Sequence, residues 1–145
     1  MNLFINADDV LDAVEKVLSV DSVFIGSDYL GGPGRIFRHK TPSPFASPFI
    51  VLTMDQLTPD DMNIYSAELR VFFYGRLLAN GQIDKSQSKC LSRIEELLNN
   101  AVPVLTGHTF QPLYCLGVVP CMYDFQDQSK ARGLVRFRLE VCKDG

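Results

Sequence analysis

The segment YSAELRVFFYG, residues 65–75, alternates between two kinds of side chain. Successive side chains of a β-strand point to opposite faces of the sheet, so this pattern predicts a strand with one apolar face and one face that mixes charge with aromatic rings. The two sets are Ala67, Leu69, Val71 and Phe73, and Glu68, Arg70, Phe72 and Tyr74. A strand of this kind is typical of a sheet that is covered on one side only.

A second alternating segment, GLVRFRLEVC at 133–142, predicts another strand of the same sheet. Its apolar set is Val135, Phe137, Leu139 and Val141, against Arg136, Arg138 and Glu140. Runs rich in β-branched and aromatic residues and bounded by polar or turn-forming residues predict further strands. We expect these strands at 21–27, 49–54, 112–119 and 121–125.

Two amphipathic helices are predicted, one within 4–20 and one within 83–101. Asn6 is the expected N-cap of the first, while Asp84 caps the second and Gln87, three residues later, completes a capping box. Both helices should pack on one face of the sheet and bury Val14, Val17, Leu91, Ile94 and Leu98 against Val71, Phe73, Phe137 and Leu139. The sequence therefore predicts an α+β fold, with two helices on one face of a mainly antiparallel sheet and a long loop or arm between the early strands.

The long connection at 31–47 has an unusual composition, because a basic, partly aromatic stretch RIFRHK (35–40) precedes closely spaced prolines. Proline fixes its own φ and favours an extended conformation in the residue before it. The prolines Pro42, Pro44 and Pro48 therefore predict a stiff arm that leads into the strand at 49–54. Such an arm can dock on a neighbouring subunit with little loss of entropy, or it can fold over its own domain as a crossover loop. The sequence leaves both alternatives open.

The totals describe one ordinary domain, 1–145, with 46% hydrophobic residues and a net charge of -3. A chain of this charge has no overall field that would draw it to nucleic acid or to an anionic membrane. The N-terminus has no basic region followed by an apolar run, and no segment is apolar enough to predict a membrane span. We expect reduced, structural thiols on one helix and three strands at Cys90, Cys115, Cys121 and Cys142, in a protein kept in the cytoplasm.

The sequence shows no pattern of a catalytic, cofactor or metal site. The glycine-rich LGGPGR at 30–35 lacks the Lys and Ser/Thr of a phosphate-binding loop. His39 and His108 are not at ligand spacing with a cysteine or a carboxylate. The Asp8/Asp9 pair suits a helix start and Asp60/Asp61 a polar loop. We therefore expect no enzyme activity, no cofactor and no metal. The basic stretches RIFRHK and Arg136/Arg138 do not by themselves favour direct nucleic-acid binding.

The order of elements resembles the tail terminator, or tail completion, proteins of tailed bacteriophages and prophages. The matching stretches are PFIV at 48–51, LRVFFYG at 69–75 leading to the helix from Asp84, and YD at 123–124 before the closing strand with Arg136 and Phe137. The resemblance covers nearly the whole chain, although the loop at 31–47 is long for that family.

This resemblance implies a structural virion protein, without catalysis or cofactor, that forms a ring, commonly of six copies. Such a ring caps the tail tube and meets the head connector, so its partners are further copies of itself, the tail tube protein and head–tail connector proteins. It would assemble in the bacterial host cytoplasm and reside in the tail or neck. An intracellular α+β ligand-binding or regulatory domain acting as a dimer is the alternative. The expected contact residues are Arg35, Phe37, Arg38, Pro42, Pro44, Phe45, Pro48, Glu68, Arg70, Arg136 and Arg138.

Overall fold

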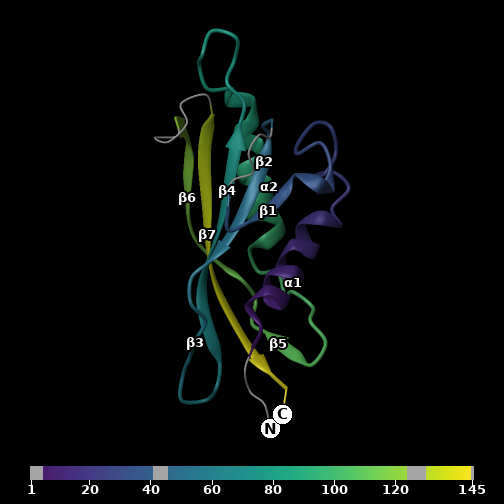
Figure 1. Ribbon diagram of the computed structural model, residues 1–145, viewed down its shortest axis with the longest axis vertical. Helices are drawn as coiled ribbons and strands as arrows, with labels where there is room; N and C mark the ends of the chain where they lie inside the picture. Colours follow the sequence, from purple (N-terminus) through teal and green to yellow (C-terminus); the bar gives the residue numbers. More distant parts are fainter. Residues whose placement is uncertain (1–4, 41–45, 124–129, 145) are drawn as a thin grey trace.

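The computed structural model describes residues 5–40, 46–123 and 130–144, and within these residues one sheet holds all seven strands (Figure 1). The strands lie in the order β1-β2-β4-β7-β5, with β3 beside β4 and β6 beside β7. Only β1 and β2 pair in parallel, which confirms the expectation of a mainly antiparallel sheet. The strands are β1 (Ile36–Arg38), β2 (Phe49–Met54), β3 (Thr58–Pro59), β4 (Tyr65–Gly75), β5 (His108–Phe110), β6 (Tyr114–Tyr123) and β7 (Ala131–Lys143).

The core lies between the β4–β7 pair and two helices, α1 (Ala7–Ser19) and α2 (Ser88–Leu98). The two strands pair without interruption from Tyr65 opposite Val141 to Gly75 opposite Ala131, so their apolar sets share one face. Both helices cover this face, as predicted. Val17 is only partly buried. The other core residues predicted from the two patterns are all buried: Val14, Val71, Phe73, Leu91, Ile94, Leu98, Phe137 and Leu139.

Both helical segments begin at the expected residues, but Gln87 has another role than the one predicted. The side chain of Asn6 accepts a hydrogen bond from the Asp8 N–H at 2.9 Å. Asp84 caps a 3₁₀ turn, η2 (Lys85–Gln87), that leads into α2. The buried Gln87 side chain does not complete a capping box, because its Oε1 accepts from the backbone N–H of Arg76. It thereby connects the end of β4 to the start of α2.

The prediction of a strand at 21–27 is wrong, because these residues form turns. The Asp21 carboxylate accepts from the Phe24 N–H at 2.8 Å, and the Ile25 N–H donates to the Asp21 carbonyl at 3.1 Å. Phe24 is fully buried in the core. An aspartate that bonds to nearby backbone groups favours a turn, and here that local bonding outweighs the β-propensity of the apolar residues that follow it.

Part of the long connection at 31–47 belongs to the sheet. Residues Ile36 to Arg38 form β1 and pair with Ile50 to Leu52 of β2. RIFRHK is therefore not a purely protruding segment, and a strand of three residues is too short to show a period-two pattern in the sequence. The prolines at 42 and 44 and Phe45 lie outside the described residues.

The closing part of the chain also differs from the prediction, since the expected strands at 112–119 and 121–125 are one strand, β6. Its pairing with β7 is irregular between Cys115 and Gly117 and between Val119 and Met122. The four cysteines are free and lie on one helix and two strands, not three. Burial raises the pKa of the Cys90 thiol to about 11. Among the described helices, neither is a long apolar segment of the kind that crosses a membrane.

Candidate interaction surface

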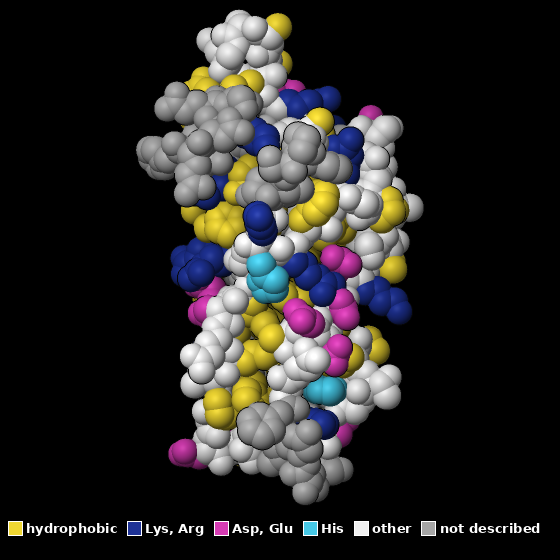
Figure 2. Space-filling model, in the orientation of Figure 1, with side chains coloured by type: hydrophobic (Ala, Val, Ile, Leu, Met, Phe, Trp, Pro, Cys, Tyr) yellow, Lys and Arg dark blue, Asp and Glu magenta, His cyan; other side chains and the backbone are white. Residues whose placement is uncertain are grey.

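The sheet face turned away from the helices, called here the outer face, gathers four of the predicted contact residues. Glu68 of β4 lies opposite Arg138 of β7, and Arg70 lies opposite Arg136. The alternation that buries the apolar set forces these four side chains onto the other side. In Figure 2, a dark blue side chain lies next to a magenta one at the left margin at mid-height, on the side away from the helices of Figure 1.

Glu68 is at the centre of this charge cluster. Its carboxylate accepts from Nε and Nη2 of Arg136 at 3.1 and 2.6 Å and lies 2.5 Å from Nε of Arg70. Arg138 pairs instead with Glu140 at 2.9 Å. The hydrogen bonds from Arg136 and the positive charge of Arg70 lower the pKa of Glu68, although its partial burial acts in the other direction. The carboxylate is therefore ionised at neutral pH and holds guanidinium groups from two strands.

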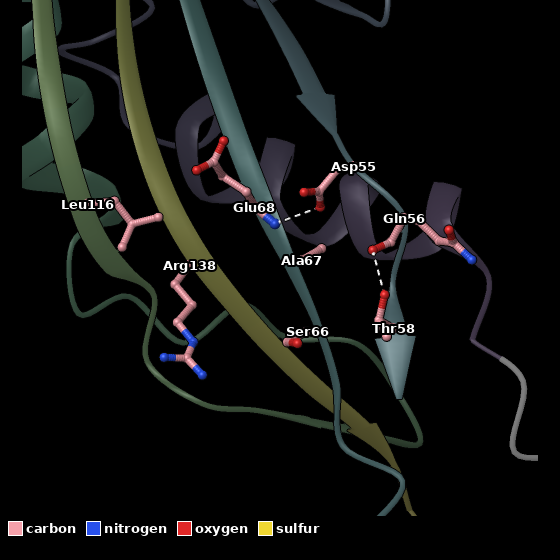
Figure 3. A pocket seen from close by; sticks show the side chains of 8 residues that line it. All are labelled: Asp55, Gln56, Thr58, Ser66, Ala67, Glu68, Leu116 and Arg138. Atoms are coloured by element: carbon pink, nitrogen blue, oxygen red, sulfur yellow. Dashed lines mark hydrogen bonds between the residues drawn. The ribbon is translucent and has the colours of Figure 1, made fainter. Parts of the chain in front are cut away.

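A shallow hollow of about 300 Å³ lies beside the cluster (Figure 3). The Asp55 carboxylate accepts from the Glu68 N–H at 2.7 Å, and Figure 3 draws this bond as a dashed line. No histidine, cysteine or lysine is among the lining residues, which are Asp55, Gln56, Thr58, Ser66, Ala67, Glu68, Leu116 and Arg138. Such a lining can hydrogen-bond polar groups and pair with charges of either sign.

Aromatic rings pack on the same outer face, where β1, β2 and β4 meet. The ring of Phe49 stacks on Tyr74 at 4.9 Å and meets the ring of Phe37 edge-on at 5.9 Å. The Lys130 ammonium lies 5.2 Å from the Phe49 ring centre. Phe49 and Tyr74 are buried, so this part of the face is a second small apolar cluster. The predicted contact residue Phe37 packs against that cluster.

Two further predicted residues, Arg35 and Arg38, lie across β2 from the charge cluster, at the β1 edge. Arg35 donates to the carbonyl groups of Ala46 and Pro48 at 2.8 and 3.0 Å. Arg38 pairs with Asp12 of α1, and its Nε lies 3.5 Å from a second α1 carboxylate, on Glu15. These arginines therefore fix the loop and the edge strand to their own domain. Pro42, Pro44 and Phe45 are outside the described residues, so their predicted contacts stay predictions.

The sequence reasoning missed the exposed side chains of β6. This strand pairs only with β7 in the part of the chain that the structure describes. Six large apolar side chains remain exposed on it: Tyr114, Leu116, Val118, Val119, Met122 and Tyr123. A signal was present in the sequence, because residues 111–123 contain no Asp, Glu, Lys or Arg. The pattern alone does not show that this strand lies at an edge.

Comparison with known proteins finds relatives in structure and none in sequence. No family model and no curated protein matches the chain. A chain from the virion of a native gene transfer agent particle has a TM-score of 0.70, with 15% identical residues, and the match covers 94% of this chain and 96% of that one. A second solved chain has a TM-score of 0.59 and 15% identity, with 98% of each chain covered. At such identity the likeness shows a shared fold.

In the described parts of the chain, no group of three or more His, Cys, Asp or Glu side chains could hold a metal ion.

Proposed function

We propose that this chain is a structural virion protein of a tailed phage, a prophage or a phage-like particle, which caps the tail tube and joins it to the head connector. The observation that carries the proposal is the likeness over almost the whole length of both chains to a component of a gene transfer agent virion. The order of elements, which resembles tail terminator proteins, points to the same role. The proposed role is structural, without catalysis or cofactor.

The proposed assembly is a ring, with six copies as the expected number. In a ring, one surface of each subunit must meet a different surface of the next. We infer two such surfaces. One is the β1 edge with the following proline-rich segment at 42–48, and the other is the outer face with its charge cluster. We propose that the β1 side of one copy contacts the outer face of its neighbour, while the ring's two ends meet the tail tube protein and the connector proteins.

The ring is tested by light scattering coupled to size-exclusion chromatography and by negative-stain electron microscopy of the purified chain, alone and with purified tails. Arg138 is suited to a charge reversal because its side chain is 63% exposed and no described core contact depends on it. Arg138→Glu should abolish rings. Lys16→Glu makes the same charge change on the exposed side of α1 and should leave them intact.

If Arg138→Glu forms rings as Lys16→Glu does, the assigned contact surface is wrong. A chain that stays a dimer with tails present, in every variant, would contradict the ring and favour the regulatory-domain alternative.

A further inference from the structure

A second hollow, of about 240 Å³, lies where the turn between α1 and β1, the residues before β2 and the residue after β4 meet. Two arginines, Arg35 and Arg76, line it together with the hydroxyl side chains of Ser27, Tyr29 and Ser47. No Asp or Glu is among its lining residues. This arginine hollow therefore gathers two positive charges in a chain whose net charge is -3. Figure 1 shows its segments in the upper half of the molecule, away from both chain termini.

Arg35 is held in position by its own domain. Its Nη1 donates to the carbonyl groups of Ala46 and Pro48 at 2.8 and 3.0 Å. Its Nε lies close to Gly31, since a Cβ built on that glycine would be 3.5 Å from it. Carbonyl groups orient a guanidinium group but carry no net charge that would cancel its own. A guanidinium group oriented in advance loses little side-chain entropy when a ligand binds.

Arg76 is exposed, and its side chain makes no hydrogen bond or ion pair in the part of the chain that the structure describes. The carboxylate of Asp84 is held elsewhere, because it accepts from the N–H and the hydroxyl of Ser86 at 3.1 and 2.6 Å. These hydrogen bonds and, to a smaller extent, the charges of Arg76 and Lys89 lower the pKa of Asp84. Asp84 does not line the arginine hollow. The Arg76 guanidinium can therefore pair with an anion that enters the hollow.

The turn that carries Ser27 and Tyr29 has a fixed shape. The N–H groups of Tyr29 and Gly31 both donate to the Gly26 carbonyl, at 3.1 and 2.9 Å. Between them, the Leu30 N–H donates to the carbonyl of the buried Phe24 at 3.0 Å. The ammonium group of Lys89 lies 5.0 Å from the centre of the Tyr29 ring and adds positive charge beside the hollow. The backbone that positions these hydroxyl groups is thus fixed by the fold.

The charge and size of the hollow indicate its ligand. Two guanidinium groups that line one hollow repel each other, and an anion between them turns this repulsion into attraction. A phosphate with one or no ester bond carries about 1.5 to 2 negative charges at neutral pH, which matches two arginines. Donors from several segments suit the oxygens of a tetrahedral group better than the two coplanar oxygens of a carboxylate. The hollow is smaller than the roughly 300–1,000 Å³ of pockets for drug-sized ligands, so it suits a small ligand.

We propose that the arginine hollow binds a doubly charged phosphate group between Arg35 and Arg76, as free phosphate or as the terminal phosphate of a small phosphomonoester. One copy of the chain supplies every lining residue, so the site is complete without assembly. The proposal goes beyond the proposed ring and does not rest on it.

The test is an NMR titration of the nitrogen-15-labelled full chain, which follows the backbone signals of residues 27–31 and the Nε signals of the two arginines. The ligands are phosphate, glycerol phosphate, dimethyl phosphate, acetate and sulfate, at constant ionic strength. Arg76→Gln removes one charge from the hollow, and Lys16→Gln removes one from the exposed side of α1 as the control. Thermal melting checks that both variants fold. All titrations are repeated with Arg138→Glu, so that the result does not depend on whether rings form.

We expect saturable binding of phosphate and glycerol phosphate, with shifts of both arginine signals. The tighter of the two ligands identifies the source of the phosphate group. Dimethyl phosphate and acetate, which carry one charge, should bind at least roughly tenfold more weakly. Arg76→Gln should weaken phosphate binding roughly tenfold, and Lys16→Gln should not change it. Between about pH 7.5 and pH 5 phosphate loses one charge and should bind more weakly, whereas sulfate keeps both charges and should not.

Three results would overturn the proposal. They are no saturation up to tens of millimolar phosphate in either the unchanged chain or Arg138→Glu, an affinity for acetate equal to that for phosphate, and equal phosphate affinities of Arg76→Gln and Lys16→Gln. Light scattering on the same samples reports whether rings form. A failure of the ring and a failure of phosphate binding are therefore separate observations.

Discussion

Glu68 connects the two central strands through charge, and its effect on stability should depend on pH. Its pKa is lowered from the ordinary value of 4.5, chiefly by the hydrogen bonds from Arg136. A carboxyl whose folded pKa is lowered stabilises the fold above its unfolded pKa, and this contribution is lost as the pH falls through the folded value. Glu68→Gln should therefore lower the free energy of unfolding at pH 7 and reduce its loss below about pH 4.5.

Urea unfolding at pH 7 and pH 3 measures this prediction, with Glu96→Gln as the control for removing an exposed carboxylate from α2. If the free energy of unfolding of Glu68→Gln falls between pH 7 and pH 3 by as much as that of the unchanged protein, the pairing with the arginines does not stabilise the fold.

Gly133 allows α2 to pack closely on β7. A Cβ at this position would lie 2.6 Å from Cδ1 of Leu91 and 3.1 Å from Sγ of Cys121. Gly133→Ala should therefore destabilise the fold by about 1–3 kcal/mol, the usual cost of overpacking a core. Gly117→Ala is a matched control in β6, because nothing lies within 4 Å of its added Cβ. Chemical unfolding gives the free energy of unfolding of each variant. Equal values for the two would mean that Leu91 moves aside at no cost.

At the level of elements, the sequence predicted what depends on long periodic patterns and missed what depends on a few contacts. The two helices, β2, β4 and most of β7 follow from apolar periodicity. An aspartate side chain holds the turn at 21–27, and β1 is a three-residue strand recognisable by its pairing with β2. The charge cluster was also predictable, because alternation places Glu68 and Arg136 on one face. The β6 edge was not, because exposure of an apolar strand depends on which strands surround it.

Gln87 shows how a single buried side chain can connect two elements. Its Oε1 is the acceptor for the Arg76 N–H at the end of β4. Gln87→Ala should lower the free energy of unfolding by about 1–3 kcal/mol, because it leaves a partly buried donor without its partner. Gln82→Ala in the exposed loop before α2 is the control and should have little effect. Thermal and urea unfolding of the two variants compare them, and a Gln87→Ala protein as stable as the control would show that water replaces the amide oxygen.

For the whole molecule, a sheet covered on one side only suits a role in assembly. The helices bury one face, so the charge cluster on the other face and the described edge strands β1 and β6 can take part in contacts. The β1 edge is basic and bound to α1, whereas the β6 edge is uncharged and apolar. A subunit whose sides differ in this way suits the heterologous contacts of a ring.

The proposed place of this chain at the junction of tail and head in a virion can be tested by locating it in particles. Cells that produce the particles would express the chain with a C-terminal affinity tag, and purified particles would be labelled with gold and viewed by electron microscopy. We expect label at one place on each particle, where the tail meets the head, and separate heads and tails when the chain is absent. Particles that assemble normally without the chain and carry no label would contradict it.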